Sequence, residues 1–532
     1  MGSVTHSLLR TWPAALLLVG AACGIPEPRV PEDAGLDADA GAAPDASVVD
    51  AGPLSMAPGE VVELELTSAA PSVGGARLAT PTGNEQFVLI IASTDFASSA
   101  VTPGYSLGLS SAPEGARTHP VTGCSLGVEP WRSSPPPTET PPGGTAVAEG
   151  TVRSLKVPTP AGYETIDAQA IAVGQRAVVW ADTTAAHPAS LDAGFVTQFL
   201  TDFENTILPR ERAIFGVESD QDGDGHVALV FSPLTYQTAV AFFSGCDLVN
   251  MQGCVSSNHG EYLYLTPPSA IAPPYNTPNA IKEILTHECS HLIHFNRKVL
   301  RNGLASWPDS AYLDEGVGGF AQDAVGPQAG NLYVTKAGLD GIRNFSLADT
   351  LFDNAAYDTA RDGVLRGGSY LFVRYLYDRA GADVANSDGS ITGQGGPSLF
   401  RALLDAPESV AAALPTQTGA PLSDIAADFY TALAMSNRDE GGGVAPLNPC
   451  FAYLPSTKDP IWNKQRGADL FATFSMQMTG PSMQSATVAD GQLRSGGVEY
   501  VVLDATAGTP ELGLAVLMTS STKPRVRIGR LR

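Results

Sequence analysis

The sequence predicts an α+β multidomain protein in which a mixed central region of strands and helices is flanked by β-sandwich-like modules. Three observations predict this class. At 532 residues, the chain is longer than one typical domain. Apolar and polar residues alternate with period two, as in half-buried strands, near both ends of the chain. Between the ends, short apolar strand candidates are followed by a series of helix candidates.

The composition is that of a folded protein with a sizeable core, because 43% of the residues are hydrophobic and 16% are charged. The charge is strongly acidic, with 31 Lys and Arg residues against 55 Asp and Glu residues and a net charge of -24. Such a surface repels phosphate backbones. We therefore expect no nucleic-acid partner.

The first residues are expected to direct export. Arg10 supplies a positive charge ahead of an apolar stretch that is too short to span a bilayer, so residues 1–22 are predicted to be a signal peptide. The Leu-Val-Gly-Ala-Ala run before Cys23 resembles a bacterial lipobox, in which Cys23 would be lipidated. Ordinary signal cleavage is the alternative. We expect an extracytoplasmic protein, either a bacterial outer-membrane lipoprotein held at the membrane through its lipid anchor or a secreted protein.

Three segments precede the central region. Residues 23–53 combine acidic residues with Ala, Gly and Pro and lack aromatic residues, which predicts a disordered acidic linker. Residues 54–128 contain an alternating run at 62–66 and apolar strand patterns beyond it, and are predicted to form a β-rich N-terminal domain, either a prodomain or an accessory module. Residues 129–149 are rich in proline and are predicted to be a stiff linker.

Residues 150–440 are predicted to form a mixed domain, and residues 441–532 a C-terminal β-rich region. The strand candidates of the mixed domain lie at 170–180, 227–231 and 262–265. The helix candidates that accompany or follow them lie at 195–207, 278–298, 311–323, 367–379, 398–404 and 422–433. The C-terminal strand candidates lie at 498–503, 512–518 and 525–528.

The cysteines fit an oxidising compartment. Cys246 and Cys254 bracket a short loop and are expected to form a local disulfide. Cys124 and Cys450 can pair only if the chain brings them together. Cys289 is left over, and we interpret it as a buried free thiol, with a redox or metal-switch role as the alternative.

The chemistry is expected to centre on His287, Glu288 and His291. Two histidines four residues apart on a helix project from the same face, so both imidazoles can reach one tetrahedral zinc ion, while the adjacent glutamate reaches the water on the metal. A helix is independently supported here, because Thr277 can cap it and Pro278 suits its first turn. This pattern arises by chance at about the one-per-cent level in a chain of this length, so its context decides.

The stretch Leu-Thr-His-Glu-Cys-Ser-His-Leu-Ile-His-Phe-Asn resembles the active-site helix of the gluzincin clan, specifically the hyicolysin-like bacterial metallopeptidases. In that family a Leu-x-Glu-Gly stretch follows, and Leu313-Asp314-Glu315-Gly316 matches it 24 residues beyond His291. Weaker likeness extends over roughly residues 160–380. The resemblance implies a zincin-like catalytic domain in which His287, His291 and Glu315 hold Zn²⁺ and Glu288 is the general base.

The function implied is that of an exported zinc metalloendopeptidase, which hydrolyses peptide bonds of protein or peptide substrates through a zinc-activated water. One alternative is a surface-anchored binding lipoprotein that keeps an inactive protease fold. The intact set of His287, Glu288, His291 and Glu315 argues against it. A second alternative is a zinc amidase that acts on cell-wall peptide, which the metal motif alone does not separate from a peptidase.

The sequence departs from the family pattern at Gly319. Many gluzincins carry at this position an aspartate that orients one histidine, so another residue must do so here, with Asp314 and Asp323 as weak candidates. His294 lies three residues after His291, which is not the spacing of a third histidine ligand. We expect it to lie in the core or to support a ligand.

Three further sites are predicted from less specific signals. Tyr370, Tyr357 and Arg366 are candidates for stabilising the oxyanion, although Tyr370 on an apolar helix is more typical of core. Residues 260–265 are expected to be either the edge strand that binds an extended substrate or an ordinary half-buried strand. Acidic residues alternate in a turn that is predicted either to bind Ca²⁺ or to be a solvated acidic turn; they are Asp220, Asp222 and Asp224.

Overall fold

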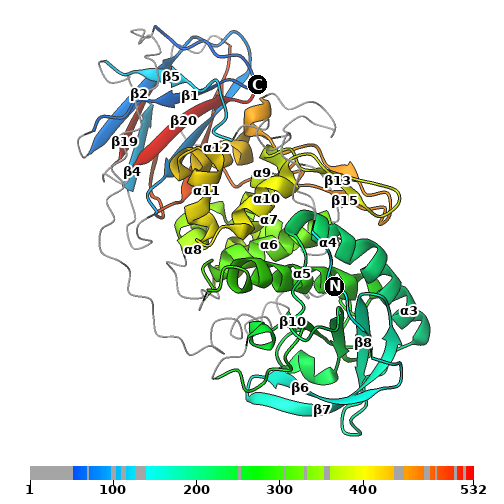
Figure 1. Cartoon of the computed structure of the whole chain (residues 1–532). Coiled ribbons are helices and arrows are strands. Elements are labelled where there is room, and N and C mark those ends of the chain that lie inside the picture. The colour runs from blue at the N-terminus through cyan, green and yellow to red at the C-terminus, as the bar shows by residue number, and fades with distance from the viewer. Residues whose placement is uncertain are drawn as a thin grey trace, which may run out of the picture.

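The computed structural model describes residues 52–532 with gaps, of which the longest are 97–103, 127–138, 353–359, 437–447 and 472–479. The predicted signal peptide, residues 23–51 of the acidic linker with Cys23, and Tyr357 lie outside the described residues. The fold is α+β, with several separate sheets and a helical centre, which confirms the predicted class (Figure 1).

Strands from the two ends of the chain form one two-layered β-module. One sheet has the order β16-β18-β3-β20-β1-β5 and the other the order β17-β4-β19-β2. The N-terminal strands are β1 (Val61–Leu64), β2 (Ser72–Leu78), β3 (Glu85–Ser93), β4 (Gly104–Leu109) and β5 (Thr118–Pro120). The C-terminal strands are β16 (Gln484–Ser485), β17 (Val488–Gln492), β18 (Val498–Ala505), β19 (Leu512–Met518) and β20 (Pro524–Arg530).

The expectation of separate N-terminal and C-terminal β-modules is therefore wrong. Strand β3 is hydrogen-bonded to β18 on one side and to β20 on the other, and β4 lies between β17 and β19. The strands coloured for the two ends of the chain alternate within the module (Figure 1). Side chains from both sheets share one apolar core, which includes Leu89, Leu107 and Val516. Neither set of strands has a complete sheet without the other.

A separate sheet precedes the central helices and has the order β10-β11-β9-β8-β7-β6; it is called the β6–β11 sheet below. Its strands are β6 (Val152–Thr159), β7 (Gly162–Val173), β8 (Ala177–Asp182), β9 (Val227–Phe231), β10 (Ala241–Phe243) and β11 (Tyr262–Leu265). The single strand expected at 170–180 is wrong, because a turn at 174–176 divides it between β7 and β8. Strands β8, β9 and β11 run parallel, and β10 closes one edge in the antiparallel direction.

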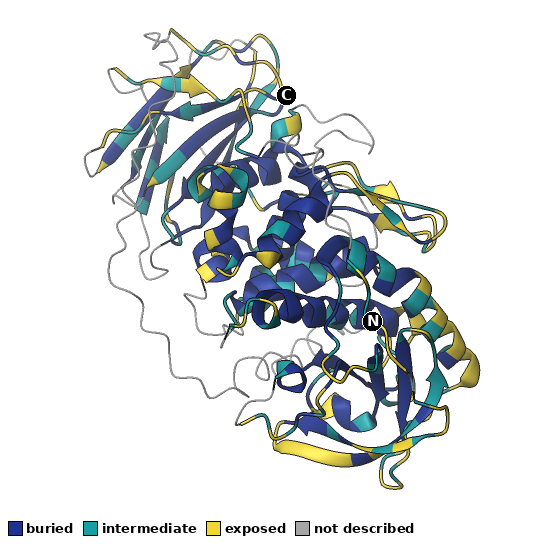
Figure 2. Cartoon of the chain, in the orientation of Figure 1, coloured by how far each residue is buried: buried dark blue, intermediate teal, exposed yellow. Residues whose placement is uncertain are grey.

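Helices fill the space between this sheet and the β-module (Figure 1). They are α3 (Ala193–Asp202), α4 (Leu208–Phe215), α5 (Pro278–Phe295), α6 (Ala311–Ala324), α7 (Leu332–Asp340), α8 (Leu347–Phe352), α9 (Asp362–Arg379), α10 (Gly396–Asp405), α11 (Val410–Thr418) and α12 (Leu422–Met435). Wider π-turns follow α3 and α5 at Phe203–Ile207 and Asn296–Leu300. Helices α5, α6 and α9 are buried over most of their surface (Figure 2). No helix among the described residues has the length and apolarity needed to cross a membrane.

The smaller elements are 3₁₀ turns and two-stranded hairpins. The turns are Pro233–Gln237, Gly245–Leu248, Pro268–Ala270, Ile342–Asn344 and Pro449–Phe451. One hairpin pairs β12 (Asp383–Ala385) with β13 (Ile391–Gly393), and the other pairs β14 (Thr457–Lys458) with β15 (Gln465–Arg466).

Part of the Pro-rich segment predicted as a linker packs against the central helices. The carboxylate of Glu139 lies 2.7 Å from a guanidinium nitrogen of Arg297 and 2.7 Å from one of Arg301, and it accepts a hydrogen bond from the amide of Val217. Burial raises the pKa of Glu139, but these arginines outweigh it and lower the pKa to about 2. The segment is thus anchored at Glu139 by charge-assisted hydrogen bonds.

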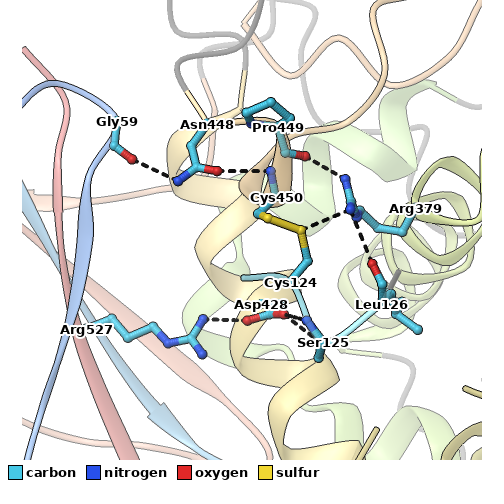
Figure 3. The surroundings of a disulfide bond; sticks show 10 residues. All are labelled: Gly59, Cys124, Ser125, Leu126, Arg379, Asp428, Asn448, Pro449, Cys450 and Arg527. Carbon is cyan, nitrogen blue, oxygen red and sulfur yellow. Dashed lines mark hydrogen bonds and ion pairs between the residues drawn. A yellow bond between two sulfur atoms is a disulfide. The ribbon is translucent and has the colours of Figure 1, made fainter. Parts of the chain in front are cut away.

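A disulfide links the β-module to the helical centre. Cys124, which follows β5, is bonded to Cys450, which follows α12, across a sequence separation of 326 residues (Figure 3). Arg379 of α9 donates to Sγ of Cys124, and Asp428 of α12 accepts from the amide and hydroxyl of Ser125 and from Arg527 of β20. The contacts around the disulfide therefore join both ends of the chain to the helices.

Candidate metal centre

Helix α5 carries two of the three candidate ligands. It begins as its sequence predicts, with the Thr277 side chain accepting a hydrogen bond from the Ala280 amide at 3.2 Å and with Pro278 in the first turn. Its apolar stripe is buried in the core. On another face of the helix, the rings of His287 and His291 meet edge to face, with their centroids 4.6 Å apart. The i, i+4 spacing thus brings both imidazoles to one place.

Helix α6 supplies the third ligand. Ser310 caps this helix by accepting a hydrogen bond from the Leu313 amide, which fixes the helix start at Ala311, four residues before Glu315. Oε2 of Glu315 lies 3.4 Å from Nε2 of His287. One donor atom from each of His287, His291 and Glu315 falls within 4.8 Å of the others. The structure brings together the three residues that the sequence singled out.

The donor set fits zinc. Two imidazole nitrogens and one carboxylate oxygen are the donor types of a catalytic zinc site, and here the three atoms lie within 4.8 Å of one another. The Nδ1 atom of His287 is buried and has no hydrogen-bond partner among the described residues. The ring of His287 is instead held by close packing against α6, where a Cβ at Gly318 would lie 2.6 Å from Nδ1 and Nε2. Glycine at this position is what allows the two helices to approach.

Arg366 of α9 lies beside the carboxylate ligand. Its guanidinium contacts Oε2 of Glu315 and also donates to Asp362 at 2.9 Å. Burial raises the pKa of Glu315, but Arg366 and His287 outweigh burial and lower the pKa to about 2. Glu315 is therefore held as a carboxylate, the form that a metal ion requires. Of the two oxyanion candidates that the structure describes, Arg366 and Tyr370, Arg366 is the one that contacts a candidate metal ligand.

Asp314 is the acidic residue that lies beside His291. Its Oδ1 lies 3.0 Å from Nδ1 of His291, an ion-pair distance without the alignment of a hydrogen bond. Burial lowers the pKa of His291, but the neighbouring Asp314 outweighs it and raises the pKa to about 10. Of the two candidates for orienting a histidine, Asp323 lies elsewhere, where it binds Arg374 and the Gly467 amide.

Glu288 faces β10 at the edge of the β6–β11 sheet. Its Oε2 accepts a hydrogen bond from the amide of Phe243 in β10 at 3.0 Å. Burial raises the pKa of Glu288, and the two histidines oppose that shift. A carboxylate whose pKa is raised is a better proton acceptor at neutral pH than an ordinary surface glutamate. The second carboxylate oxygen of Glu288 is then the one available to a water molecule.

The edge strand beside the site is β10 rather than the segment at 260–265. Strand β11 (Tyr262–Leu265) is hydrogen-bonded on both sides, to β9 and to β10, so it has no free edge for a substrate. Within the part of the chain that the structure describes, β10 pairs with β11 alone, and it lies against α5. Of the two interpretations of 260–265, the substrate-binding edge is therefore wrong, because three residues at 241–243 insert as an additional strand.

Tyr370 is engaged away from the metal ligands. Its hydroxyl donates to Asp323 at 3.2 Å, and burial raises its pKa. Asp323 follows Glu315 by eight residues on α6, which corresponds to about 12 Å along the helix. This placement favours the interpretation of Tyr370 as a core residue.

The acidic turn brings its three carboxylates together, with one oxygen from each of Asp220, Asp222 and Asp224 within 4.8 Å of the others. Each of them also accepts a hydrogen bond from a backbone amide of the same turn. Both predicted interpretations, a Ca²⁺ site and a solvated acidic turn, are compatible with this geometry, and Ca²⁺ binding stays a prediction.

The cysteines pair as one local and one long-range disulfide, Cys246–Cys254 and Cys124–Cys450. Cys289 is free and buried, and burial raises the pKa of its thiol.

On α4, Glu211 is fully buried and neither carboxylate oxygen has a hydrogen-bond partner among the described residues. Burial raises its pKa well above the ordinary value, with His291 opposing. No sequence motif marks Glu211, because its isolation depends on tertiary packing.

Comparison of the chain with models of known protein families and with curated proteins finds no match.

Proposed function

We propose that this chain is an exported zinc metallopeptidase with a zincin-like catalytic domain. The observation that carries the proposal is the convergence of His287, His291 and Glu315, from two helices, with the Glu288 carboxylate beside them. An antiparallel edge strand next to the helix that bears the histidines supports it further, because an extended peptide can pair with such an edge.

His287, His291 and Glu315 would hold the metal. Zinc bound there would act as a Lewis acid toward the peptide carbonyl and lower the pKa of water from 15.7 to about 7. Glu288 accepts the proton of the attacking water and then donates it to the departing amine. The amide of Phe243 holds one oxygen of Glu288, so the other oxygen is directed by the fold.

Arg366 is the cation placed to act beside these residues. Its guanidinium fixes the Glu315 carboxylate and brings positive charge next to the ligands. Negative charge that develops on the carbonyl oxygen during attack would be stabilised by this cation. Protein or peptide substrates are the class that such an arrangement serves.

The test is to measure bound zinc and casein hydrolysis for the full chain and for matched variants. Glu288→Gln is expected to retain zinc and to lose activity by about 10²- to 10⁴-fold, the usual contribution of general acid–base catalysis. Glu315→Ala is expected to lose zinc as well. Glu164→Gln, an exposed glutamate of β7, serves as the control and should change neither quantity. Full activity of Glu288→Gln would exclude this mechanism, and hydrolysis of purified cell-wall peptide without hydrolysis of casein would favour an amidase.

A further inference from the structure

His294 is buried between two carboxylates. The side chain has no solvent exposure, its Nδ1 lies 2.8 Å from Oδ1 of Asp314, and its Nε2 lies 3.1 Å from Oδ2 of Asp309. A neutral imidazole carries a single N–H, whereas ionised carboxylates only accept hydrogen bonds. Both contacts are satisfied together when the ring carries two protons. Burial lowers the pKa of His294, but the two carboxylates outweigh it and raise the pKa.

Asp314 connects this ring to a metal ligand. The same Oδ1 atom that faces His294 also lies 3.0 Å from Nδ1 of His291. A carboxylate oxygen fixed in this place favours the tautomer of His291 that carries its proton on Nδ1. The lone pair of Nε2 is then left for the metal. The position of Asp314 therefore bears directly on how His291 presents its ligand atom.

Asp309 anchors the other end of the chain of contacts. Its Oδ1 accepts a hydrogen bond of 2.6 Å from the amide of Val410, the first residue of α11. The ring of His294 also packs edge to face on Trp307, with centroids 4.7 Å apart. The carboxylate and the ring are thus both held by groups outside α5, and both side chains are shielded from bulk solvent.

We propose that His294 is a positioning residue of the metal centre: it holds Asp314 where that carboxylate orients His291, and Asp309 ties His294 to the start of α11. The inference rests on the proposed zinc centre. It extends the site beyond its ligands to a buried row that runs His291, Asp314, His294, Asp309 and Val410.

A purely structural histidine would behave differently from a positioning one. If His294 only fills the core, its replacement lowers the stability of the zinc-free fold, and the affinity for zinc follows that loss. If it positions Asp314, the affinity for zinc falls by more than the stability of the zinc-free fold explains. Partners that orient metal-binding histidines typically contribute 10- to 100-fold to affinity.

The experiment measures zinc affinity by competition with a chelator, and thermal stability in excess chelator, on the full chain. His294→Leu removes both donors and keeps an apolar, buried side chain, while His294→Gln keeps one donor. Leu292→Ala is the matched control, because Leu292 is fully buried on the same helix and its side chain belongs to the apolar core. Replacing zinc by Co²⁺ gives a visible absorption spectrum that reports ligand geometry.

We expect His294→Leu to weaken zinc binding by about 10- to 100-fold and to alter the Co²⁺ spectrum, with His294→Gln in between. Leu292→Ala should lower the thermal midpoint, reduce zinc affinity by no more than that loss of stability explains, and leave the spectrum as in the unmodified chain. Unchanged zinc affinity in both His294 variants would overturn the inference while leaving the zinc centre intact. If the unmodified chain binds zinc no better than His287→Ala, the zinc centre itself fails, and the inference fails with it.

Discussion

The disulfide Cys124–Cys450 is predicted to be a major contributor to the stability of the fold. It closes a loop of 326 residues and joins the β-module to the helices (Figure 3). The perturbation is the double substitution Cys124→Ala and Cys450→Ala. This change also removes the sulfur that accepts a hydrogen bond from Arg379, although Arg379 keeps the carbonyls of Pro449 and Leu126 as acceptors.

The magnitude follows from the loop that each disulfide closes. A cross-link stabilises chiefly by reducing the entropy of the unfolded chain, and the reduction grows with the logarithm of loop length. For the separation of 326 residues the free energy of unfolding should fall by about 6 kcal/mol when the link is lost. For Cys246–Cys254, with a separation of 8 residues, the same relation gives about 2.5 kcal/mol.

The assay is chemical denaturation followed by far-ultraviolet circular dichroism, on the unmodified chain and on both double variants. Cys246→Ala with Cys254→Ala is the control, since it removes a disulfide of the same chemistry that closes a short loop. We expect the long-range variant to unfold at a clearly lower denaturant concentration than the control variant. Equal shifts for the two variants would refute the reasoning from loop length.

Three further predictions follow from the described contacts. Glu211→Gln should stabilise the fold, and by more at pH 8 than at pH 5. Burial raises the folded-state pKa of Glu211, so the unmodified fold keeps its stability below the unfolded pKa of about 4.5 and loses stability as the pH rises, because the unfolded chain then releases this proton more readily. Glutamine carries no such proton, so the variant escapes this loss. Thermal midpoints across this range, with Glu164→Gln as control, test it, and a pH-independent difference would contradict it. Removal of residues 54–128 should leave β18 and β20 without β3 between them and abolish folding, as judged by circular dichroism; a folded, active product would identify this segment as a prodomain. Gly318→Ala should push the ring of His287 aside and weaken zinc binding, measured by chelator competition, although alanine favours a helix by about 1 kcal/mol.

Local signals predicted the parts of the fold that depend on neighbouring residues. The expected strands at 227–231 and 262–265 have the bounds of β9 and β11, because each is a short apolar run with few alternatives. Helix α5 begins at the residue after Thr277, because its cap and its proline are local features. In these segments the pattern that marks the element lies within the element itself and the few residues beside it.

Partners far apart in sequence could not be predicted in this way. The alternation around Val62 and the apolar runs near Tyr500 indicate strands, but nothing in either pattern specifies that β3 lies between β18 and β20. Pairing depends on long-range packing, and each strand pattern is compatible with several partners. The inserted strand β10 was missed for a related reason, because three residues are too few to show a period.

The residues of the candidate site also fall into two groups, those identified by local spacing and those whose roles depend on tertiary packing. His287, Glu288 and His291 are fixed by spacing on one helix, so the sequence alone identified them. The roles of Asp309 and His294 depend on the approach of α6 and α11 to α5, which no spacing encodes.

The glycines of α6 show that a local conflict can mark such an approach. Glycine in a helix interior costs about 1 kcal/mol relative to alanine, yet α6 carries Gly316, Gly318 and Gly319 within one turn. A Cβ at Gly316 would lie 2.8 Å from Cβ of Ser369, and one at Gly318 would lie 2.6 Å from the His287 nitrogens, whereas one at Gly319 would make ordinary contact at 3.6 Å. Two of the three glycines are thus required by neighbouring side chains, those of Ser369 and His287. A helix that accepts this loss of stability beside a metal-binding motif is one whose close packing serves the site, and Glu315 lies directly before the first of these glycines.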